Sequence, residues 1–448
     1  MPRAVMGLLF YPRGGSAQVT RSLARQLPSY GWEVTIVSGS LGHGDRTDAR
    51  RFFDGLDVRA VDYTDAAAAS DPLAADPPMH PSYEDRSEAP DPVFARVDDV
   101  GYERLVAAWS RELDAAGGAR ADVLHLHHLT PLNEAASRIA AAVPVVGHIH
   151  GTELLMLEEI ASSPPAGWDY AEAWVERMRR WLDGCAGIVV LSPTQLQRLE
   201  HLLGVVADRC TVVPNGYDPE IFRPREVDRA AHWRRHLVES PQGWRAGGEP
   251  GSVSYREGDL EPFAEGPVLL YVGRYTSVKR LGLLIRAYAR AQDRFATPAP
   301  LVLVGGFPGE WEDEHPFESI EASGARDVFL AGWHEHADLP DFLAASDVVV
   351  LPSVREQFGQ VLVEGMACGL PAIAVDAYGP AEIVDDGRTG WLVPPDDEDA
   401  LADALVEAVN DAGERRRRGK AARKVAAERY SWPALAQGVA ELYDAVRR

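Results

Sequence analysis

The chain has 448 residues, of which 46% are hydrophobic and 25% are charged. This length is typical of two domains of roughly 200 residues each, and the composition excludes a chain that is disordered throughout. A formal net charge of -23 repels phosphate backbones and anionic lipid surfaces. We therefore expect no nucleic-acid partner and at most peripheral membrane contact.

The cysteines and the N-terminus indicate the cellular location. Cys185, Cys210 and Cys368 are odd in number and lack the spacing of a zinc site, which favours a reduced protein. The apolar stretch 5–10 is too short for a signal peptide or a membrane span and predicts a first β-strand. The sequence thus predicts a cytoplasmic protein.

The first half of the chain alternates between strand and helix patterns. Strand 5–10, a Gly14-Gly15 turn, a helix over 17–30 and strand 33–37 form a βαβ unit. Alternation resumes at 123–127 and ends near residue 222. Between these parts, residues 65–99 are acidic and rich in proline, which predicts a long surface excursion and hints at a functional loop.

The second half repeats the pattern after a stretch rich in glycine and charge. Apolar, β-branched runs begin at residue 268 and predict buried parallel strands, and the tail from residue 398 is helical. We predict an N-terminal Rossmann-like domain over 1–225, a linker or insertion over 226–265, a C-terminal Rossmann-like domain over 266–430 and a final helix over 431–448.

Ligands of open parallel sheets bind beyond the carboxyl ends of the strands, so residues that follow strands are the first candidates. Gly14 and Gly15 precede a helix and allow its N-terminus to approach a phosphate or a sugar. The Gly-x-Gly-x-x-Gly pattern of dinucleotide-binding enzymes is missing after this strand, which disfavours hydride transfer. His150 ends a strand within 147–153 and can donate to a hydroxyl, although a histidine satisfied by its neighbours fits equally well.

Three further histidines, His125, His127 and His128, cluster near another strand end. Such clustering suggests metal binding, but the sequence shows no matching carboxylate pattern. We therefore predict no metal here.

Arg274 and Lys279 follow the strand 268–273 and precede a helix. Two cations beside a helix N-terminus form a cradle for a diphosphate. Only three of the 45 basic residues are lysines, so a lysine here indicates a need for a compact charge, with chance as the alternative.

The segment 352–371 reads as strand end, loop, short helix, glycine stop and strand. It carries Glu356 in the loop and Glu364 in the helix. Carboxylates can clamp vicinal hydroxyls by accepting two hydrogen bonds, whereas the alternative is a pair of solvated charges.

Glu356 and Glu364 with their flanking residues resemble the Glu-x7-Glu motif of the retaining family 4 glycosyltransferases. Arg274 with Lys279, 214–218 and 379–384 are also similar to that family. The resemblance implies a GT-B fold: two Rossmann-like domains that face a deep interdomain cleft, with a C-terminal helix that crosses back to the N-terminal domain. It runs from Gly14 to the last helix.

The resemblance also implies the functional residues. The catalytic residues would be His150, Arg274, Lys279 and Glu356. The donor-binding residues would be Gly14, Gly15, Phe358, Gly359, Gln360 and Glu364.

Their roles follow the family pattern. Arg274 and Lys279 would hold the diphosphate, Glu364 the ribose, and Glu356 the sugar hydroxyls, while His150 would contact the transferred sugar. Because two cations can replace a metal ion, we expect neither a metal nor a cofactor.

The resulting hypothesis is an enzyme of the EC 2.4 type. It would move a hexose with retention from a nucleotide sugar, with UDP-sugars favoured, to a soluble small-molecule or saccharide acceptor. Two alternatives remain: a nucleotide-sugar epimerase or hydrolase of the same fold, and a catalytically inactive GT-B binding protein.

Overall fold

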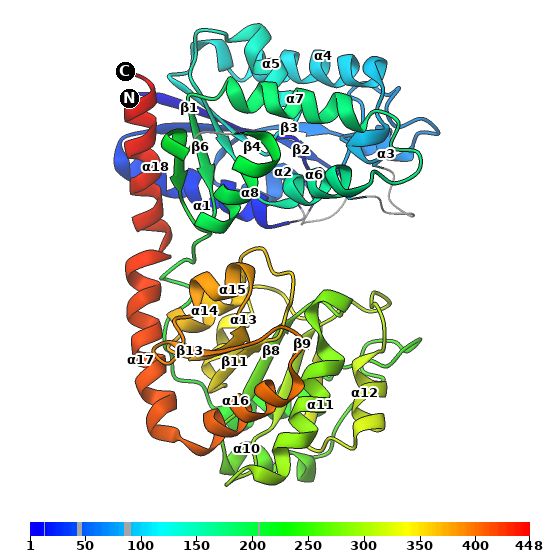
Figure 1. Cartoon of the computed structure of the whole chain (residues 1–448), viewed down its shortest axis with the longest axis vertical. Coiled ribbons are helices and arrows are strands. Elements are labelled where there is room, and N and C mark those ends of the chain that lie inside the picture. Colours follow the sequence, from blue (N-terminus) through cyan, green and yellow to red (C-terminus); the bar gives the residue numbers. More distant parts are fainter. Residues whose placement is uncertain (13, 43–46, 85–90, 205–206) are drawn as a thin grey trace. The chain divides into compact units, whose positions relative to one another are not determined.

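A computed structural model describes residues 1–12, 14–42, 47–84, 91–204 and 207–448. The chain forms two compact units (Figure 1). The first unit contains residues 1–215 together with 432–448, and the second contains residues 216–431. The units therefore meet in sequence at 215/216 and 431/432, where we had placed boundaries after residues 225 and 430.

The first unit is built on a seven-stranded parallel sheet with the order β3-β2-β1-β4-β5-β6-β7. From β1 the chain adds β2 and β3 on one side of the sheet and then β4 to β7 on the other side. The order of strands therefore reverses between β1 and β4, and open α/β sheets bind ligands at such a reversal point. The strands are β1 (Arg3–Leu8), β2 (Glu33–Ser40), β3 (Asp57–Asp62), β4 (Val123–His127), β5 (Val145–His148), β6 (Gly187–Val190) and β7 (Cys210–Val212).

Helices cover both faces of this sheet. Alternate residues of β1 enter two different apolar clusters: Val5 packs with α4, α5 and α7, whereas Ala4 and Met6 pack with α1 and α18. The helices are α1 (Gly15–Gln26), α2 (Ala49–Phe52), α3 (Thr64–Ala68), α4 (Asp99–Ala115), α5 (Pro131–Ile139), α6 (Thr152–Ser162), α7 (Ala171–Asp183), α8 (Pro193–Leu203) and α18 (Trp432–Val446).

The last helix, α18, belongs to the first unit, which confirms the predicted return of the chain. The Tyr443 hydroxyl lies 2.6 Å from Nδ1 of His125 on β4, and the Tyr30 hydroxyl donates to the Pro433 carbonyl at 2.7 Å. The ring of Tyr443 also packs edge-on against Trp32. Polar and aromatic contacts thus fix α18 to the sheet.

The segment 65–99 is only partly the surface excursion that its composition predicts, since residues 67–77 are exposed or half-buried. Farther along, Met79, His80, Tyr83 and Phe94 are buried in the core of the first unit, and the Tyr83 hydroxyl donates to the Leu129 carbonyl at 2.7 Å. The prediction was wrong for 78–83 and for most of 91–97, because a few apolar and aromatic residues among the prolines and acids anchor these stretches. Part of it, residues 85–90, lies outside the described residues.

The second unit contains a six-stranded parallel sheet with the order β10-β9-β8-β11-β12-β13, so β8 and β11 mark its reversal point. The strands are β8 (Leu269–Gly273), β9 (Leu301–Gly305), β10 (Val328–Gly332), β11 (Val348–Leu351), β12 (Ala372–Val375) and β13 (Gly390–Val393). Their side chains are largely buried, as expected of a parallel sheet covered on both faces.

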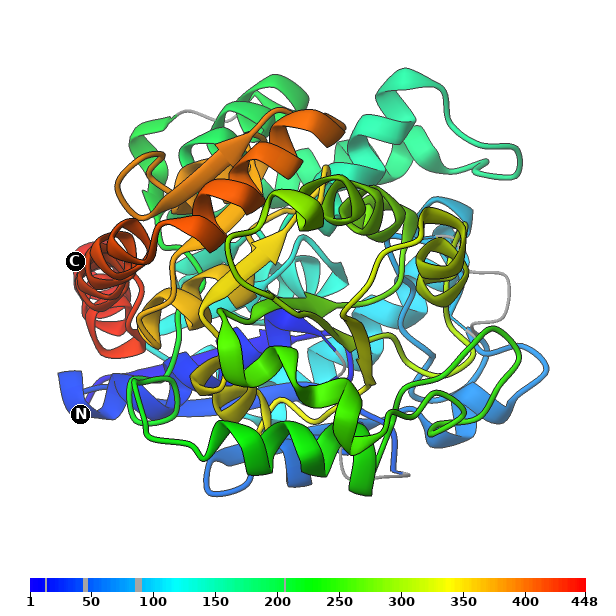
Figure 2. The same ribbon diagram turned by 90° about the horizontal axis from the view of Figure 1, so that it is seen from below.

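Helix α11 packs beside α12 and α16, and α14 packs beside α17 (Figures 1 and 2). The helices of this unit are α9 (Arg229–Arg234), α10 (Pro262–Glu265), α11 (Leu281–Ala291), α12 (Pro316–Ser323), α13 (Leu339–Ala344), α14 (Gln360–Ala367), α15 (Tyr378–Ile383), α16 (Glu398–Asn410) and α17 (Ala412–Arg429). Within the described residues, no helix is both long and apolar enough to cross a membrane.

Residues 226–265, which we predicted as a linker or insertion, lie inside the second unit. Trp233, Leu237 and Trp244 are fully buried in its core. The Trp244 indole also donates to the Gly306 carbonyl at 3.1 Å. Large apolar side chains thus attach this glycine-rich segment to the sheet.

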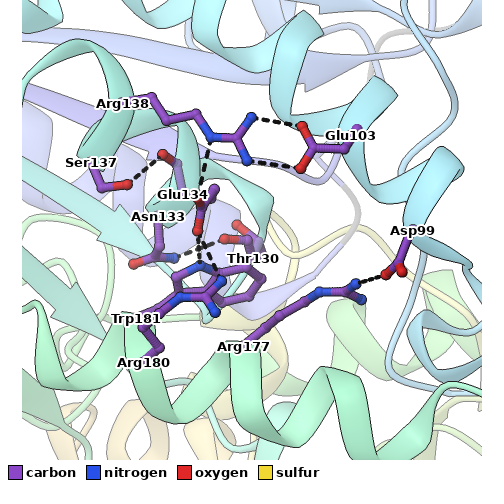
Figure 3. A network of polar contacts seen from close by, with 10 residues as sticks. All are labelled: Asp99, Glu103, Thr130, Asn133, Glu134, Ser137, Arg138, Arg177, Arg180 and Trp181. Atoms are coloured by element: carbon purple, nitrogen blue, oxygen red, sulfur yellow. Dashed lines mark hydrogen bonds and ion pairs between the residues drawn. The ribbon is translucent and has the colours of Figure 1, made fainter.

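A polar network joins α4, α5 and α7 on the outside of the first unit (Figure 3). Glu134 of α5 is its centre, because its carboxylate accepts from Arg138 at 3.2 Å, Arg180 at 3.1 Å and the Trp181 indole at 3.1 Å. Arg138 also makes a bidentate pair with Glu103. Partial burial raises the pKa of Glu134, but these donors outweigh it and lower the pKa overall.

We predict that Glu134→Ala lowers the free energy of unfolding by about 1–3 kcal/mol, because three donors lose one acceptor. A carboxyl whose pKa is lower in the folded chain stabilises it above the unfolded pKa, and this contribution disappears as the pH falls below about 4. Denaturant titration at pH 7 and pH 3.5 measures both effects. The exposed pair of Glu176 with Arg179 supplies the control, since Glu176→Ala should change stability by less than about 0.5 kcal/mol. Equal effects of the two substitutions at pH 7 would contradict the prediction.

Candidate functional site

Two loops of the second unit meet at the ends of β8 and β11. The Val278 carbonyl accepts hydrogen bonds from the Val354 amide at 3.0 Å and the Ser353 hydroxyl at 3.2 Å. This contact brings Lys279 to Glu356, whose Oε2 accepts a hydrogen bond from the Lys279 ammonium. The two side chains are only 17% and 19% exposed, so solvent screens the pair weakly. The structure thus joins two residues that the sequence predicted separately.

Arg274 follows β8 directly and is exposed. Its carbonyl accepts from the Tyr271 hydroxyl at 2.8 Å, which fixes the backbone, while its guanidinium forms no ion pair with any described residue. Glu312 accepts two hydrogen bonds from Ser277 that lower its pKa, and the charge of Arg274 lowers it further. Arg274 therefore supplies an available cation in the loop that also carries Lys279.

Glu364 lies on α14 with only 2% of its surface exposed. Its Oε1 accepts from Nε2 of His336 at 2.8 Å and from the Gln360 amide at 3.2 Å. Gln360 also donates to the Gly216 carbonyl at 2.8 Å. In the described part of the chain both bonds go to Oε1, so Oε2 keeps its capacity to accept from a hydroxyl.

His336 is a site residue that sequence reasoning missed. It follows β10 in the chain, and its ring lies 5.2 Å from that of Phe222. The signal was its place just beyond the end of a strand, which is the criterion that selected Arg274. Because it sits 28 residues before Glu364, only the fold reveals the pairing.

Helix α14 begins at a bare N-terminus. Gly359 caps it with a φ of 97° and no side-chain hydrogen bond, so the first amides of the helix can bind an anion or a hydroxyl. The Gly379 amide donates to the Glu356 carbonyl at 3.1 Å, and a Cβ at Gly379 would lie 2.3 Å from the Phe358 carbonyl oxygen. The loop 356–359 therefore rests against the backbone of α15.

Gly14, Gly15 and His150 belong to the first unit, and the other predicted site residues belong to the second. Helix α1 starts at Gly15, with Gly14 as an extended cap that makes no side-chain hydrogen bond. Among the described residues beyond its own chain neighbours, no heavy atom lies within 4 Å of a Cβ built on either glycine. The turn after β1 is thus open to a ligand.

His150 ends a row of imidazoles on β4 and β5. Adjacent rings stack with planes 8–26° apart in the pairs His125–His148, His148–His150 and His127–His150. Burial lowers the pKa of His125 to about 3 and is also the first cause of the lowered pKa values of His127, His148 and His150. The row is therefore neutral at pH 7.

A carboxylate holds the end of this row. Glu153 is fully buried and accepts from the His150 amide at 3.0 Å and from Nδ1 of His128 at 3.3 Å. His128 has a φ of 66°, a conformation that costs a residue with a side chain energy and that concentrates at functional sites. Burial raises the pKa of Glu153, but His128 and the hydrogen bonds lower it overall.

The ligand nitrogens of His125, His127 and His148 lie within 4.8 Å of one another, as in a possible metal site. A nitrogen that binds a metal ion must direct a free lone pair at that ion. Both nitrogens of His125 are occupied, by the Tyr443 hydroxyl at 2.6 Å and by Nδ1 of His148 at 3.1 Å. The geometry favours a hydrogen-bonded stack over a metal centre.

This strand order in the two sheets, with the last helix returned to the first unit, defines the GT-B fold. Two sequence profiles agree: residues 13–221 match "Glycosyltransferase Family 4" and residues 258–425 match "Glycosyl transferases group 1". The D-inositol 3-phosphate glycosyltransferase of Kribbella flavida is 31% identical over 72% of this chain and 70% of its own length. The chain belongs to glycosyltransferase family 4.

Other relatives and solved structures cover most or all of the chain. The alpha-maltose-1-phosphate synthase of Mycolicibacterium smegmatis is 28% identical over 80% of this chain and 86% of its own length. The sucrose-phosphate synthase of Thermosynechococcus elongatus has a TM-score of 0.68 at 20% identity, covering 100% of this chain and 99% of that one. Anabaena HepE in complex with UDP-glucose has a TM-score of 0.67 at 19% identity and covers 99% of both chains. These structures share the fold.

We predict that Gly379→Ala lowers the transferase kcat/KM at least about tenfold, because the new methyl group must displace the Phe358 backbone and with it Glu356. Initial-rate kinetics measure the loss, and circular dichroism checks the fold. Gly438→Ala on α18 is the matched control, since no atom lies within 4 Å of its Cβ and activity should not change. Wild-type kinetics in Gly379→Ala would show that the contact is irrelevant.

Proposed function

We propose that the protein is a retaining hexosyltransferase that uses a UDP-hexose donor, needs no metal ion, and glycosylates a soluble small molecule or saccharide. The observation that carries the proposal is the pairing of Lys279 with Glu356 at the ends of β8 and β11. Arg274 lies in the same loop as Lys279, and Glu364 lies one turn into the helix that follows Glu356.

The proposed mechanism is electrostatic. Departure of a nucleoside diphosphate places negative charge on its phosphate oxygens, and fixed cations lower the barrier to that step. Arg274 and Lys279 supply these cations, and the amides at the start of α14 add donors. When the diphosphate binds the Lys279 ammonium, the carboxylate of Glu356 loses that partner and can accept a hydrogen bond from a sugar hydroxyl. Glu364 accepts from the ribose through Oε2.

The nucleotide and the acceptor are inferred from the relatives and from the charge of the chain. HepE is described in complex with UDP-glucose, which supports uridine as the base. The names of the relatives indicate inositol phosphate and maltose phosphate chemistry, which supports a small hydroxylated acceptor. The net charge of -23 disfavours an acceptor embedded in an anionic membrane.

Retention follows the family pattern, in which the acceptor attacks on the face that the diphosphate leaves. In that arrangement a phosphate oxygen accepts the proton of the attacking hydroxyl.

The two alternatives, an epimerase or hydrolase and an inactive binding protein, use the same donor site differently. Release of free sugar that matches nucleotide release would favour hydrolysis, and donor binding without any turnover would favour the binding protein.

We predict that Lys279→Ala lowers kcat about a hundredfold, because a preorganised donor to the leaving group contributes about 3 kcal/mol. A coupled assay of UDP release measures the rate. Lys420→Ala, at an exposed position of α17, is the matched control and should leave the rate unchanged. Near-normal turnover in Lys279→Ala would rule out its role at the diphosphate.

We predict that the protein binds UDP-hexose more tightly than ADP-hexose or GDP-hexose. We also predict that EDTA changes the transfer rate by less than about twofold, because two protein cations neutralise the charge of the diphosphate. Calorimetry with the three nucleotide sugars measures the preference. Proton NMR of the product reports the anomeric configuration, which should equal that of the donor. Loss of activity in EDTA, restored by one divalent cation, would contradict the metal-free mechanism.

A further inference from the structure

The contact between His127 and His150 determines which hydrogen-bond role His150 can play. Nδ1 of His127 lies 2.9 Å from Nε2 of His150. Both imidazoles are neutral, so each carries one proton on one nitrogen. One ring therefore donates in this contact and the other accepts.

The surroundings of His127 decide between the two arrangements. His127 is fully buried, and its Nε2 has no hydrogen-bond partner among the described residues. If His150 donated, His127 would carry its proton on Nε2 and bury an N–H group without an acceptor. A buried donor without a partner is costly and rarer in proteins than an acceptor with a spare lone pair. His127 therefore keeps its proton on Nδ1 and donates.

The role of His150 follows. Its Nε2 accepts from His127, so its own proton resides on Nδ1. His150 is only partly buried, whereas His127, His148 and His125 are fully buried. The stacked rings and the Glu153 bond to its amide fix the direction of the imidazole.

We infer that His127 is a positioning residue that fixes His150 in the tautomer with Nδ1–H, so that His150 acts as a hydrogen-bond donor to an oxygen atom of the transferred sugar. The sugar as the acceptor rests on the proposed function. The tautomer itself rests only on the contacts within the first unit.

The chain offers a matched pair of substitutions. His127→Asn keeps an amide N–H near the position of Nδ1, and its side-chain oxygen takes the place of the ring carbon Cδ2. His127→Leu has nearly the same shape without a donor. His201→Asn, on the exposed surface of α8, serves as the control.

The first measurement is the nitrogen NMR spectrum of the histidine rings in the full chain at pH 7, with His150→Gln to assign the His150 signals. Wild-type protein and His127→Asn should show a protonated Nδ1 and an unprotonated Nε2 on His150, and His127→Leu should shift the proton toward Nε2. A proton on Nε2 of His150 in the wild type would overturn the inference. So would an unchanged spectrum in His127→Leu.

The second measurement is turnover of UDP-glucose. His127→Leu should lower kcat roughly tenfold, the scale of one lost hydrogen bond, with little change in KM. His127→Asn should restore the rate to within about twofold of wild type, which a purely structural role would not do. Equal losses in both variants would overturn the inference. If the wild type turns over no nucleotide sugar, the proposed function fails, while the NMR spectra still decide the tautomer.

Discussion

Two opposite charges held at the ends of neighbouring strands organise the second unit. The strand order places β8 beside β11, and parallel strands end at one edge of the sheet, so the loops that follow them must be neighbours. Lys279 and Glu356 meet there with little exposure. Because water screens the pair weakly, the two charges interact strongly. An anionic ligand that binds the Lys279 ammonium therefore also releases the Glu356 carboxylate to another partner. In the proposed function, this contact links diphosphate binding to sugar recognition.

The first unit also holds side chains at the ends of two neighbouring strands, but these side chains are uncharged. At the edge formed by β4 and β5 it stacks imidazoles instead of pairing charges. Burial keeps these rings neutral, so that each hydrogen bond has a fixed direction. The fully buried carboxylate of Glu153 accepts a hydrogen bond from the backbone amide of His150 and so fixes the backbone at the end of the row. A rigid and satisfied network of this kind presents one histidine in a single orientation.

Most of the fold and several residues of the candidate site could be predicted from the sequence, because strand patterns and residues that follow strands are local features. Lys279 and Glu356 were found in this way. Local patterns could not show that His336 pairs with Glu364 or that Gly379 supports Phe358, since only the fold brings these residues together. Composition misled us over 78–83 and most of 91–97, because a few buried aromatic residues outweigh many prolines and acids.

The most direct test of this account is a crystal structure of the protein with UDP and with a non-hydrolysable UDP-hexose. The account predicts that the diphosphate lies between Arg274 and the Lys279 ammonium, that Glu356 has turned from Lys279 to a sugar hydroxyl, and that the ribose hydroxyls reach Glu364. A diphosphate bound elsewhere, with the contact between Lys279 and Glu356 unchanged, would contradict it.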